Sequence, residues 1–272
     1  MDIPAPPETR PTPAEPARSL AIIVEHLTKQ FDKVLAVDDI SFAVPQGEFF
    51  GFLGPNGAGK STTIRVLCGL LRADYSRIQV AGHDLRQDNL GVKASIGVML
   101  EEPVLYERLS AREHLRFIGE LYGLETAEAD RRGEELLGLL SLTGDADRLI
   151  VDYSQGMRKK VSLACALIHQ PPVLFLDEPF TGIDTVTARL IKDLLRRRVE
   201  EGATIMFSSH VMEVVERICT GVAIIHRGRI VFSDTMANLR ARPDYESLED
   251  VFIQAVGEEE LTHAEDRSWL GE

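Results

Sequence analysis

The amino-acid sequence predicts an α/β protein with a parallel-sheet core that is interrupted by a helical insertion. Three short apolar runs, at residues 48–53, 173–177 and 204–207, have the length and continuous hydrophobicity of strands that are buried on both faces. Between the first two runs, residues from about 109 to 168 show the spacing of amphipathic helices instead. A chain of 272 residues and 30.2 kDa is long enough for one such domain with a subdomain.

The elements ahead of the insertion follow a tail with little to bury. Residues 1–18 are rich in Pro, Ala and charge, and this composition is typical of a disordered segment. From Leu20 the pattern changes, and 21–27 and 40–44 are predicted strands. After the apolar run at 48–53 comes a glycine-rich turn, and residues 62–69 are the predicted helix that follows it.

The insertion is predicted to contain three helices. Ser110 and Glu113 form a capping box at the start of the first, which carries apolar residues at helical spacing. Residues 125–142 form the second. The third begins near Ser154 and ends before Pro171, because proline cannot continue a helix.

Strands return after the insertion. A helix is predicted at 189–199, between the apolar runs at 173–177 and 204–207. Two further strands, at 222–225 and 229–232, flank a short turn, and the segment from about 246 is acidic with a helical pattern.

The elements divide the chain into three parts. We expect a disordered tail over 1–18, a globular domain over 19–240 with a helical subdomain inserted at about 105–168, and an acidic extension over 241–272.

Composition disfavours several classes of function. A net charge of −13, from 30 Lys and Arg against 43 Asp and Glu, argues against a surface that grips a nucleic-acid duplex. The three cysteines are widely spaced, which disfavours a zinc site or a disulfide framework. No run approaches the ~18 apolar residues that a bilayer-spanning helix needs. We therefore expect a soluble protein that reaches a membrane only through a partner.

The glycine-rich turn carries the strongest chemical signal. Residues 54–61 read Gly-Pro-Asn-Gly-Ala-Gly-Lys-Ser and match the phosphate-binding pattern GxxxxGK[ST] in full. A strand precedes the turn and a helix follows it, which disfavours a chance glycine-rich turn, and the helix N-terminus adds a positive dipole end. Lys60 is expected to reach the phosphates, and the Ser61 hydroxyl to ligate Mg²⁺. The predicted nucleotide-binding set is Gly54, Pro55, Asn56, Gly57, Ala58, Gly59, Lys60, Ser61 and Thr62.

An acidic pair ends the apolar run at 173–177. A carboxylate at the end of a buried strand is costly unless it faces a cation, so Asp177 is predicted to hold Mg²⁺ through water. Glu178 is placed to polarise the attacking water. The alternative for both is a strand end that only reaches solvent. Because no NKxD guanine-reading motif is present, ATP is favoured over GTP.

A second anion site is predicted where the third helix begins. Residues 153–158 read Tyr-Ser-Gln-Gly-Met-Arg, which places Ser154 at a helix N-cap near the positive end of the helix dipole. Taken alone, an ordinary helix cap would explain this segment as well.

Taken in order, the motifs resemble those of the ATP-binding cassette (ABC) family over residues 20–235. Residues 153–157 stand where that family has its signature, residues 181–184 resemble its D-loop, and His210 after Ser208 and Ser209 resembles its switch histidine. Phe31 occupies the place of the aromatic residue that stacks on adenine. The resemblance implies a P-loop NTPase fold, with a RecA-like parallel-sheet core, an antiparallel β subdomain and an α-helical insertion subdomain.

The resemblance also implies a mechanism. Two cassettes pair head to tail, and the ATP of one lies against Ser154, Gln155 and Gly156 of the other. His210 contacts the γ-phosphate of the ATP bound to its own chain. The implied partners are a second cassette and an integral membrane permease, with no nucleic acid, and the implied location is the cytoplasmic face of the cell membrane.

Two residues depart from the family pattern. Glu101 stands where the family usually has a glutamine that senses Mg²⁺, and Gln155 replaces a glycine of the signature. A carboxylate can still ligate Mg²⁺, so activity is expected to survive. The signature resembles that of ABC-2-type exporters of drugs, antibiotics and sodium. Residues 101–108, with Leu105 and Tyr106, are the expected permease contact.

Two other functions remain open at this point. A soluble ABC ATPase that acts on ribosomes or nucleic acid is the first, although such relatives tend to carry two cassettes, a long coiled coil or zinc modules. A nucleotide sensor that does not hydrolyse is the second, and the presence of Asp177, Glu178 and His210 together disfavours it.

Overall fold

A computed structural model describes residues 19–257 of the chain. The tail predicted over 1–18 and the last part of the acidic extension lie outside the described residues.

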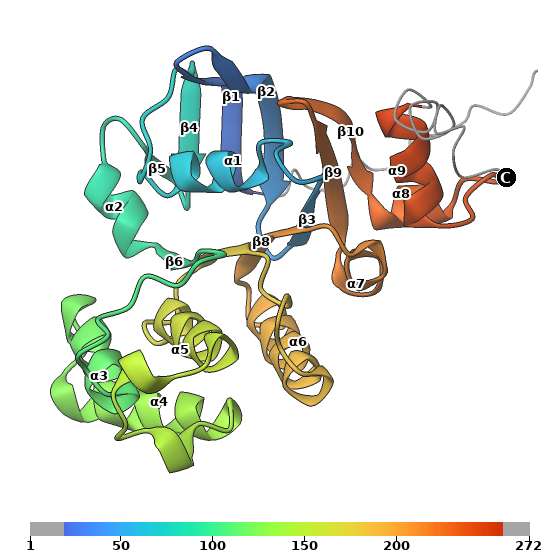
Figure 1. The fold of residues 1–272 in the computed structure, drawn as a ribbon. Helices are drawn as coiled ribbons and strands as arrows, with labels where there is room; N and C mark the ends of the chain where they lie inside the picture. The colour runs from blue at the N-terminus through green and yellow to red at the C-terminus, as the bar shows by residue number, and fades with distance from the viewer. Residues whose placement is uncertain (1–18, 258–272) are drawn as a thin grey trace, which may run out of the picture.

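The core is a six-stranded sheet in the order β10-β9-β3-β8-β7-β6 (Figure 1). Neighbouring strands from β9 to β6 run parallel, and only the edge strand β10 is antiparallel. Every residue of β3, β7 and β8 is buried, as their continuous apolar runs predict for strands that are covered on both faces. The strands are β3 (Phe49–Leu53), β6 (Ile96–Met99), β7 (Val173–Asp177), β8 (Thr204–Ser209), β9 (Gly221–His226) and β10 (Arg229–Thr235).

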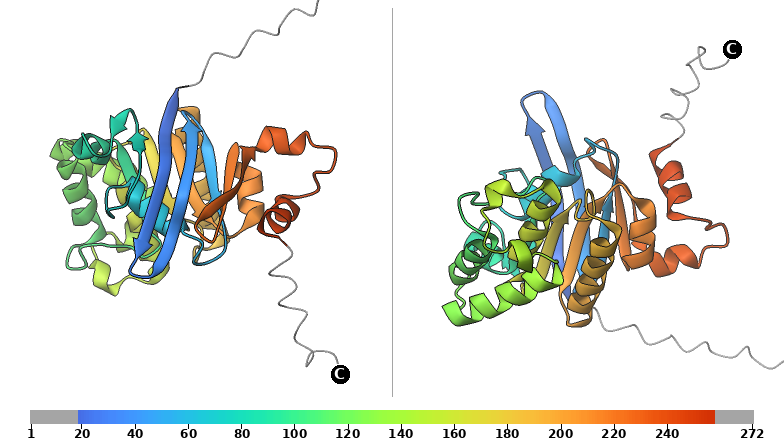
Figure 2. Two further views of the ribbon diagram at one scale, coloured as in Figure 1. Left: turned by 90° about the horizontal axis from the view of Figure 1, so that it is seen from above. Right: turned by 60° about the horizontal axis from the view of Figure 1, so that its bottom comes forward.

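A second, four-stranded antiparallel sheet has the order β2-β1-β4-β5. Its strands are β1 (Leu20–Phe31), β2 (Val34–Pro45), β4 (Arg77–Val80) and β5 (His83–Asp84). The first two form a long ribbon that Figure 2 shows crossing the molecule. Together the two sheets confirm the predicted fold class, with its parallel core, antiparallel β subdomain and helical insertion.

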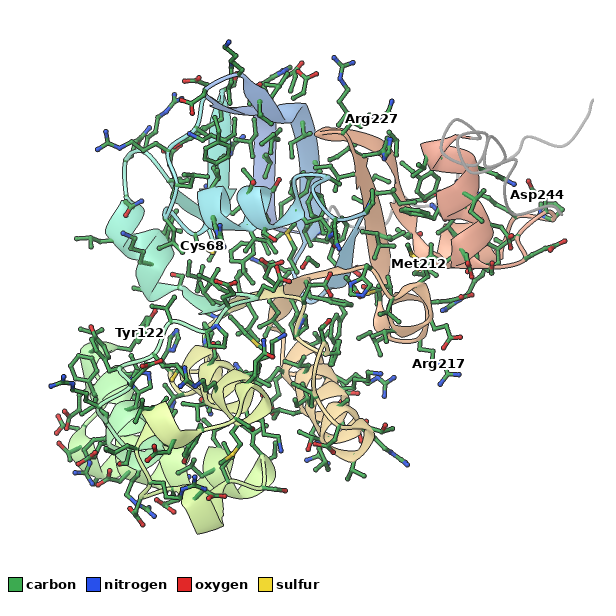
Figure 3. The ribbon with its side chains drawn as sticks, viewed as in Figure 1. Cys68, Tyr122, Met212, Arg217, Arg227 and Asp244 are labelled. Atoms are coloured by element: carbon green, nitrogen blue, oxygen red, sulfur yellow. The ribbon has the colours of Figure 1, made fainter. Side chains whose placement is uncertain are left out.

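Helix α1 (Lys60–Leu67) lies between the two sheets, where its buried residues join one apolar cluster with residues of both. A second cluster forms on the other face of the parallel sheet, beneath α3 (Ala111–Leu121), α4 (Thr126–Leu139), α5 (Gln155–Leu167) and α6 (Thr185–Glu200). Cys68 at the end of α1 and Tyr122 at the end of α3 lie on the two sides of the junction between the sheets and the helical subdomain (Figure 3). The capping box predicted at Ser110 and Glu113 is present at the start of α3.

Several elements differ in length from the sequence-based expectation. Strands β1 and β2 extend well beyond 21–27 and 40–44, because bulges and left-handed residues at His26 (φ 54°) and Asp39 (φ 51°) break the alternation that a sequence pattern reveals. Helix α6 begins at Thr185 rather than at 189, where the Asp184 side chain accepts a hydrogen bond from the Thr187 backbone N–H.

The chain after the parallel sheet packs back onto it. Helix α7 (Met212–Ile218) follows β8, and α8 (Met236–Arg240) and α9 (Leu248–Val256) follow β10. Leu239 and Leu248 are fully buried in the cluster beneath the parallel sheet. The C-terminal helices and the helical subdomain lie at opposite ends of the molecule (Figure 2).

Candidate functional site

The glycine-rich turn joins β3 to α1 and lines a cavity of about 250 Å³. The cavity brings together residues that are far apart in the sequence: the turn itself, the strand end after β7 and the segment after β6. Its lining residues are Ala36, Asn56, Gly57, Gly59, Lys60, Ser61, Thr62, Glu101 and Glu178. Most of the predicted nucleotide set therefore faces one space, together with the proposed metal ligands Ser61 and Glu101.

Two glycines of the turn are required by space and by backbone conformation. A Cβ atom at Gly54 would lie 2.3 Å from the carbonyl oxygen of Ile225, well inside van der Waals contact. Gly59 has φ 111°, and a Cβ atom there would lie 2.5 Å from the carbonyl oxygen of Ala36. Only glycine fits such positions at little cost, so the turn keeps a backbone lining that suits an anion.

Lys60 is the cation of this cavity and is only 6% exposed. Its Nζ donates hydrogen bonds to the carbonyl oxygens of Gly54 (2.7 Å) and Pro55 (3.0 Å). Burial lowers the pKa of Lys60, whereas the nearby carboxylates of Glu178, Asp177 and Glu101 raise it. An ammonium group held over an anion-binding turn suits the phosphates of a nucleotide.

Asp177 ends β7 and is fully buried behind the turn. Its Oδ1 accepts a hydrogen bond from Ser208 Oγ on the neighbouring strand β8, at 2.5 Å. Its Oδ2 is buried and, within the described residues, has no hydrogen-bond partner. Because a buried carboxylate oxygen without a partner is costly, this atom fits a cation or a cation-bound water.

No group of three or more His, Cys, Asp or Glu side chains among residues 19–257 is arranged to hold a metal ion. A cation near Asp177 Oδ2 would therefore need the Ser61 hydroxyl, water and phosphate oxygens as further ligands. Mg²⁺ is usually bound in this way, through one or two carboxylates, several waters and the substrate.

Glu178 has a strained backbone, and each oxygen of its carboxylate has a hydrogen-bond partner. Its φ of 50° lies in the left-handed region, which costs a non-glycine residue about 1–3 kcal/mol. Its N–H donates to Ser208 Oγ (3.0 Å), and its Oε2 accepts from Thr181 Oγ1 (3.1 Å). Its Oε1 lies 2.9 Å from His210 Nδ1. The structure thus brings together Glu178 and His210, two of the predicted site residues.

The predicted signature residues lie apart from the cavity. Ser154 caps α5 by accepting a hydrogen bond from the Met157 N–H (3.3 Å), and both Ser154 and Gln155 are exposed. Among the described residues that line the cavity, none belongs to the signature. The signature and the cavity of one chain are therefore separate surfaces.

Phe31 lies at the end of β1 and is 43% exposed, so it is no core residue. The Lys29 Nζ lies 4.8 Å from the centre of its ring. Phe31 does not line the cavity, whereas Ala36, on the adjoining strand β2, does. Its role toward adenine stays a prediction.

Sequence reasoning missed three contributors to the site. Ala36 carries no chemical signal, and Ser208 was noted only as part of the segment before His210. A hydroxyl directly after the apolar part of β8 was the available signal for Ser208. The third is Lys159, which is 3% exposed and donates to the carbonyl oxygen of Thr181 at 2.8 Å.

Within residues 19–257 no helix is both long enough and apolar enough to cross a bilayer.

Comparison with known proteins gives consistent matches. The sequence pattern of the ABC transporter family matches residues 37–181. Linearmycin resistance ATP-binding protein LnrL of Bacillus subtilis is 36% identical over 86% of this chain and 75% of its own length. ABC transporter ATP-binding protein NatA of the same organism is 37% identical over 81% of this chain and 90% of its own length. Daunorubicin/doxorubicin resistance ATP-binding protein DrrA of Streptomyces peucetius is 36% identical over 81% of this chain and 67% of its own length.

Two solved structures show the same fold. An ATP-binding subunit of an ABC transporter superposes with a TM-score of 0.82 at 31% identity, over 87% of this chain and all of its own. A dimeric ATP-binding cassette in a post-hydrolysis state, bound to ADP and Pi, superposes with a TM-score of 0.73 at 21% identity. The superposition covers 79% of this chain and 98% of that one.

Proposed function

The chain belongs to the ABC transporter family, and we propose that it is the ATP-hydrolysing subunit that drives a separately encoded membrane permease, in the direction of export. As a member of this family it is a nucleotide-binding ATPase. The observation that carries the proposal is the division of the site: phosphate turn, acidic pair and His210 stand together in one chain, whereas the signature is exposed elsewhere.

The residues of the cavity divide the chemistry between them. The turn and Lys60 bind the phosphates, and Ser61, Glu101 and Asp177 Oδ2 are the oxygen donors for Mg²⁺. When bound, Mg²⁺ neutralises charge on the phosphates. Glu101 takes the place of the family's usual glutamine and adds a negative charge beside Lys60.

Glu178 and His210 act on the attacking water and the γ-phosphate. Glu178 lines the cavity, where its carboxylate orients a water and accepts the water's proton as the water oxygen attacks the γ-phosphorus; the bond from that phosphorus to the bridging oxygen breaks, and ADP and phosphate leave. Its hydrogen bonds to Thr181 and His210 hold the carboxylate in one orientation. His210 is half exposed, so its ring can also reach toward a phosphate.

A second copy completes the site in this proposal. Ser154 and Gln155 are exposed at the positive end of α5, where they can bind the γ-phosphate of a facing chain. A cassette of the same fold forms a dimer with ADP and Pi, which supports a head-to-tail pair here. ATP binding would then close the pair, and hydrolysis would reopen it.

The segment after Glu101 supplies the proposed permease contact. Val104 is 84% exposed and Tyr106 is 59% exposed, and the Tyr106 ring packs edge-on against Phe117 of α3 (centroids 5.4 Å apart). Leu105 packs against the core, so Tyr106 is the stronger candidate of the two. Exposed aromatic and aliphatic side chains on one segment are typical of a protein-binding surface.

This segment is tied to the signature by Arg158. The guanidinium of Arg158 bonds to the carboxylate of Glu107 (2.6 Å) and to the backbone carbonyl oxygens of Val151 (2.9 Å) and Tyr153 (3.3 Å). A movement of the permease contact can therefore be passed to the first turn of α5, and so to the facing nucleotide. Export is proposed because the relatives include linearmycin and daunorubicin resistance proteins.

Purification from membranes tests the proposal. The tagged chain, produced in its own cells, is extracted in mild detergent, and co-purifying chains are identified by mass spectrometry. A multi-span membrane protein is the expected partner, and Tyr106→Glu should release it because the carboxylate would be buried in an apolar contact. Leu90→Glu, which places the same carboxylate at an exposed apolar residue of α2 (Asn89–Ala94) outside this segment, is the matched control. Co-purification of ribosomal particles instead, unaffected by Tyr106→Glu, would refute the proposal.

A further inference from the structure

A buried lysine lies directly behind the signature. Lys159, in the second turn of α5, is 3% exposed, although Ser154 and Gln155 at the start of the same helix are exposed. Burying an ammonium group is costly, and hydrogen bonds from the group offset part of that cost. The Lys159 Nζ donates to one acceptor, the carbonyl oxygen of Thr181, at 2.8 Å.

Thr181 in turn bonds to Glu178 twice, once to its carboxylate and once to its backbone. Its Oγ1 donates to Glu178 Oε2 (3.1 Å), and its N–H donates to the Glu178 carbonyl oxygen (3.3 Å). These bonds close a tight turn that begins at the left-handed Glu178. A strained residue keeps its conformation only when its surroundings hold it, and Lys159 holds the far side of this turn.

The same turn also packs against the signature. A Cβ atom at Gly156 would lie 3.3 Å from the carbonyl oxygen of Gly182, so the two backbones approach closely. Lys160 Nζ lies 3.8 Å from the Asp184 carboxylate. The start of α5 and the turn at 178–184 are therefore linked by backbone packing and by two lysines.

We propose that Lys159 is a positioning residue that orients Glu178 through Thr181, and that it thereby links each chain's signature to that chain's own hydrolytic carboxylate. In the proposed head-to-tail pair the signature faces the second copy's ATP, so the same contacts would connect the two bound nucleotides. This part of the inference rests on the proposed function. The orientation of Glu178 by Lys159 is a property of one chain.

Lys159→Met tests the contact, because methionine keeps an unbranched apolar side chain and removes the ammonium group. We expect kcat for ATP hydrolysis to fall about tenfold, since small displacements of a reacting group are costly. KM should stay unchanged, because Lys159 does not line the nucleotide cavity. Lys159→Arg should recover part of kcat, and Lys93→Met, which removes an exposed lysine of α2 (Asn89–Ala94), should match the wild type.

A double-variant cycle separates positioning from general loss of structure. Thr181→Val removes the hydroxyl that binds Glu178 but keeps the carbonyl oxygen that binds Lys159. If both residues act through Glu178, the double variant should lose little more kcat than the worse single variant. Fully additive losses, or a kcat of Lys159→Met equal to that of the wild type, would overturn the inference.

Hydrogen exchange provides a readout that does not depend on turnover. Backbone amides of the peptide spanning 174–184 should exchange faster in Lys159→Met than in the wild type, and Lys93→Met should leave them unchanged. If exchange is unchanged in Lys159→Met, the contact between Lys159 and Thr181 does not restrain this turn, and the inference is wrong. Failure of the wild type to retain a permease would instead refute the proposed transport function, and would leave the kcat and exchange results to decide the role of Lys159.

Discussion

Replacing Glu178 by glutamine separates ATP binding from hydrolysis. Glutamine has nearly the same shape, so it can keep one acceptor for Thr181 or His210 at the distances that the carboxylate now makes, 3.1 and 2.9 Å. It cannot accept a proton from water. Loss of a general base costs about 10²–10⁴-fold in rate, which corresponds to about 3–5 kcal/mol in activation free energy.

ATP binding should survive this change. The phosphate turn and Lys60 remain intact, and Lys60 loses only one of the three carboxylates that act on its pKa. With one fewer negative charge near the phosphates, the affinity for ATP should stay equal or rise. Without hydrolysis, ATP should also hold two copies together as a stable dimer.

The assay measures phosphate release at saturating MgATP, ATP binding by equilibrium dialysis and dimer content by size-exclusion chromatography. Glu249→Gln, which removes an exposed carboxylate of α9, is the matched control and should behave like the wild type. Wild-type turnover in Glu178→Gln would refute the assignment of the base. Loss of ATP binding together with turnover would show that the carboxylate acts on binding instead.

Three further changes test other parts of the structure. Gly59→Ala should abolish ATP binding, because its Cβ would meet a backbone carbonyl oxygen at 2.5 Å, whereas Gly138→Ala, whose Cβ has room, should bind ATP normally in the same dialysis assay. Arg158→Gln and Glu107→Gln should each lower the stimulation of ATPase activity by the co-purified permease, and the double variant should lower it no further than either single variant. Because the ion pair is partly exposed, the free energy of unfolding should change by less than about 1 kcal/mol in urea titrations. Burial lowers the pKa of His114 from 6.5 to about 4, so the unfolded chain binds a proton that the folded chain does not. Stability should therefore fall as pH drops from about 6.5 toward 4, by about 2–3 kcal/mol in urea titrations. The slope should be smaller in His114→Gln, and equal slopes would rule His114 out.

Elements with a strong local signal could be predicted from the sequence. Strands β3, β7 and β8 are continuous apolar runs because both faces of a parallel sheet are covered. Helix α3 was predicted because its capping box and apolar spacing agree with each other. The phosphate turn was predicted because its glycines and lysine are all close in the chain.

Elements that depend on distant contacts were missed or shortened. Strand β6 is four residues long, Ile-Gly-Val-Met, and its pairing with β7 across an intervening helical subdomain is what makes it a strand. Helices α2 and α7 are too short to show a helical period. The ends of β1 and β2 depend on cross-strand pairing that continues through bulges, which sequence alternation does not reveal.

The sequence by itself determined the chemistry that the chain can offer: a backbone-lined turn for phosphates, a lysine beside it, and an acidic pair after a buried strand. Only the tertiary structure decided how these groups meet. Asp177 Oδ2 is left for a cation because Ser208, on the neighbouring strand, takes the other oxygen. Ser154 is exposed, and Lys159 behind it reaches Thr181. These outcomes depend on contacts between residues far apart in the chain, which local sequence patterns do not specify.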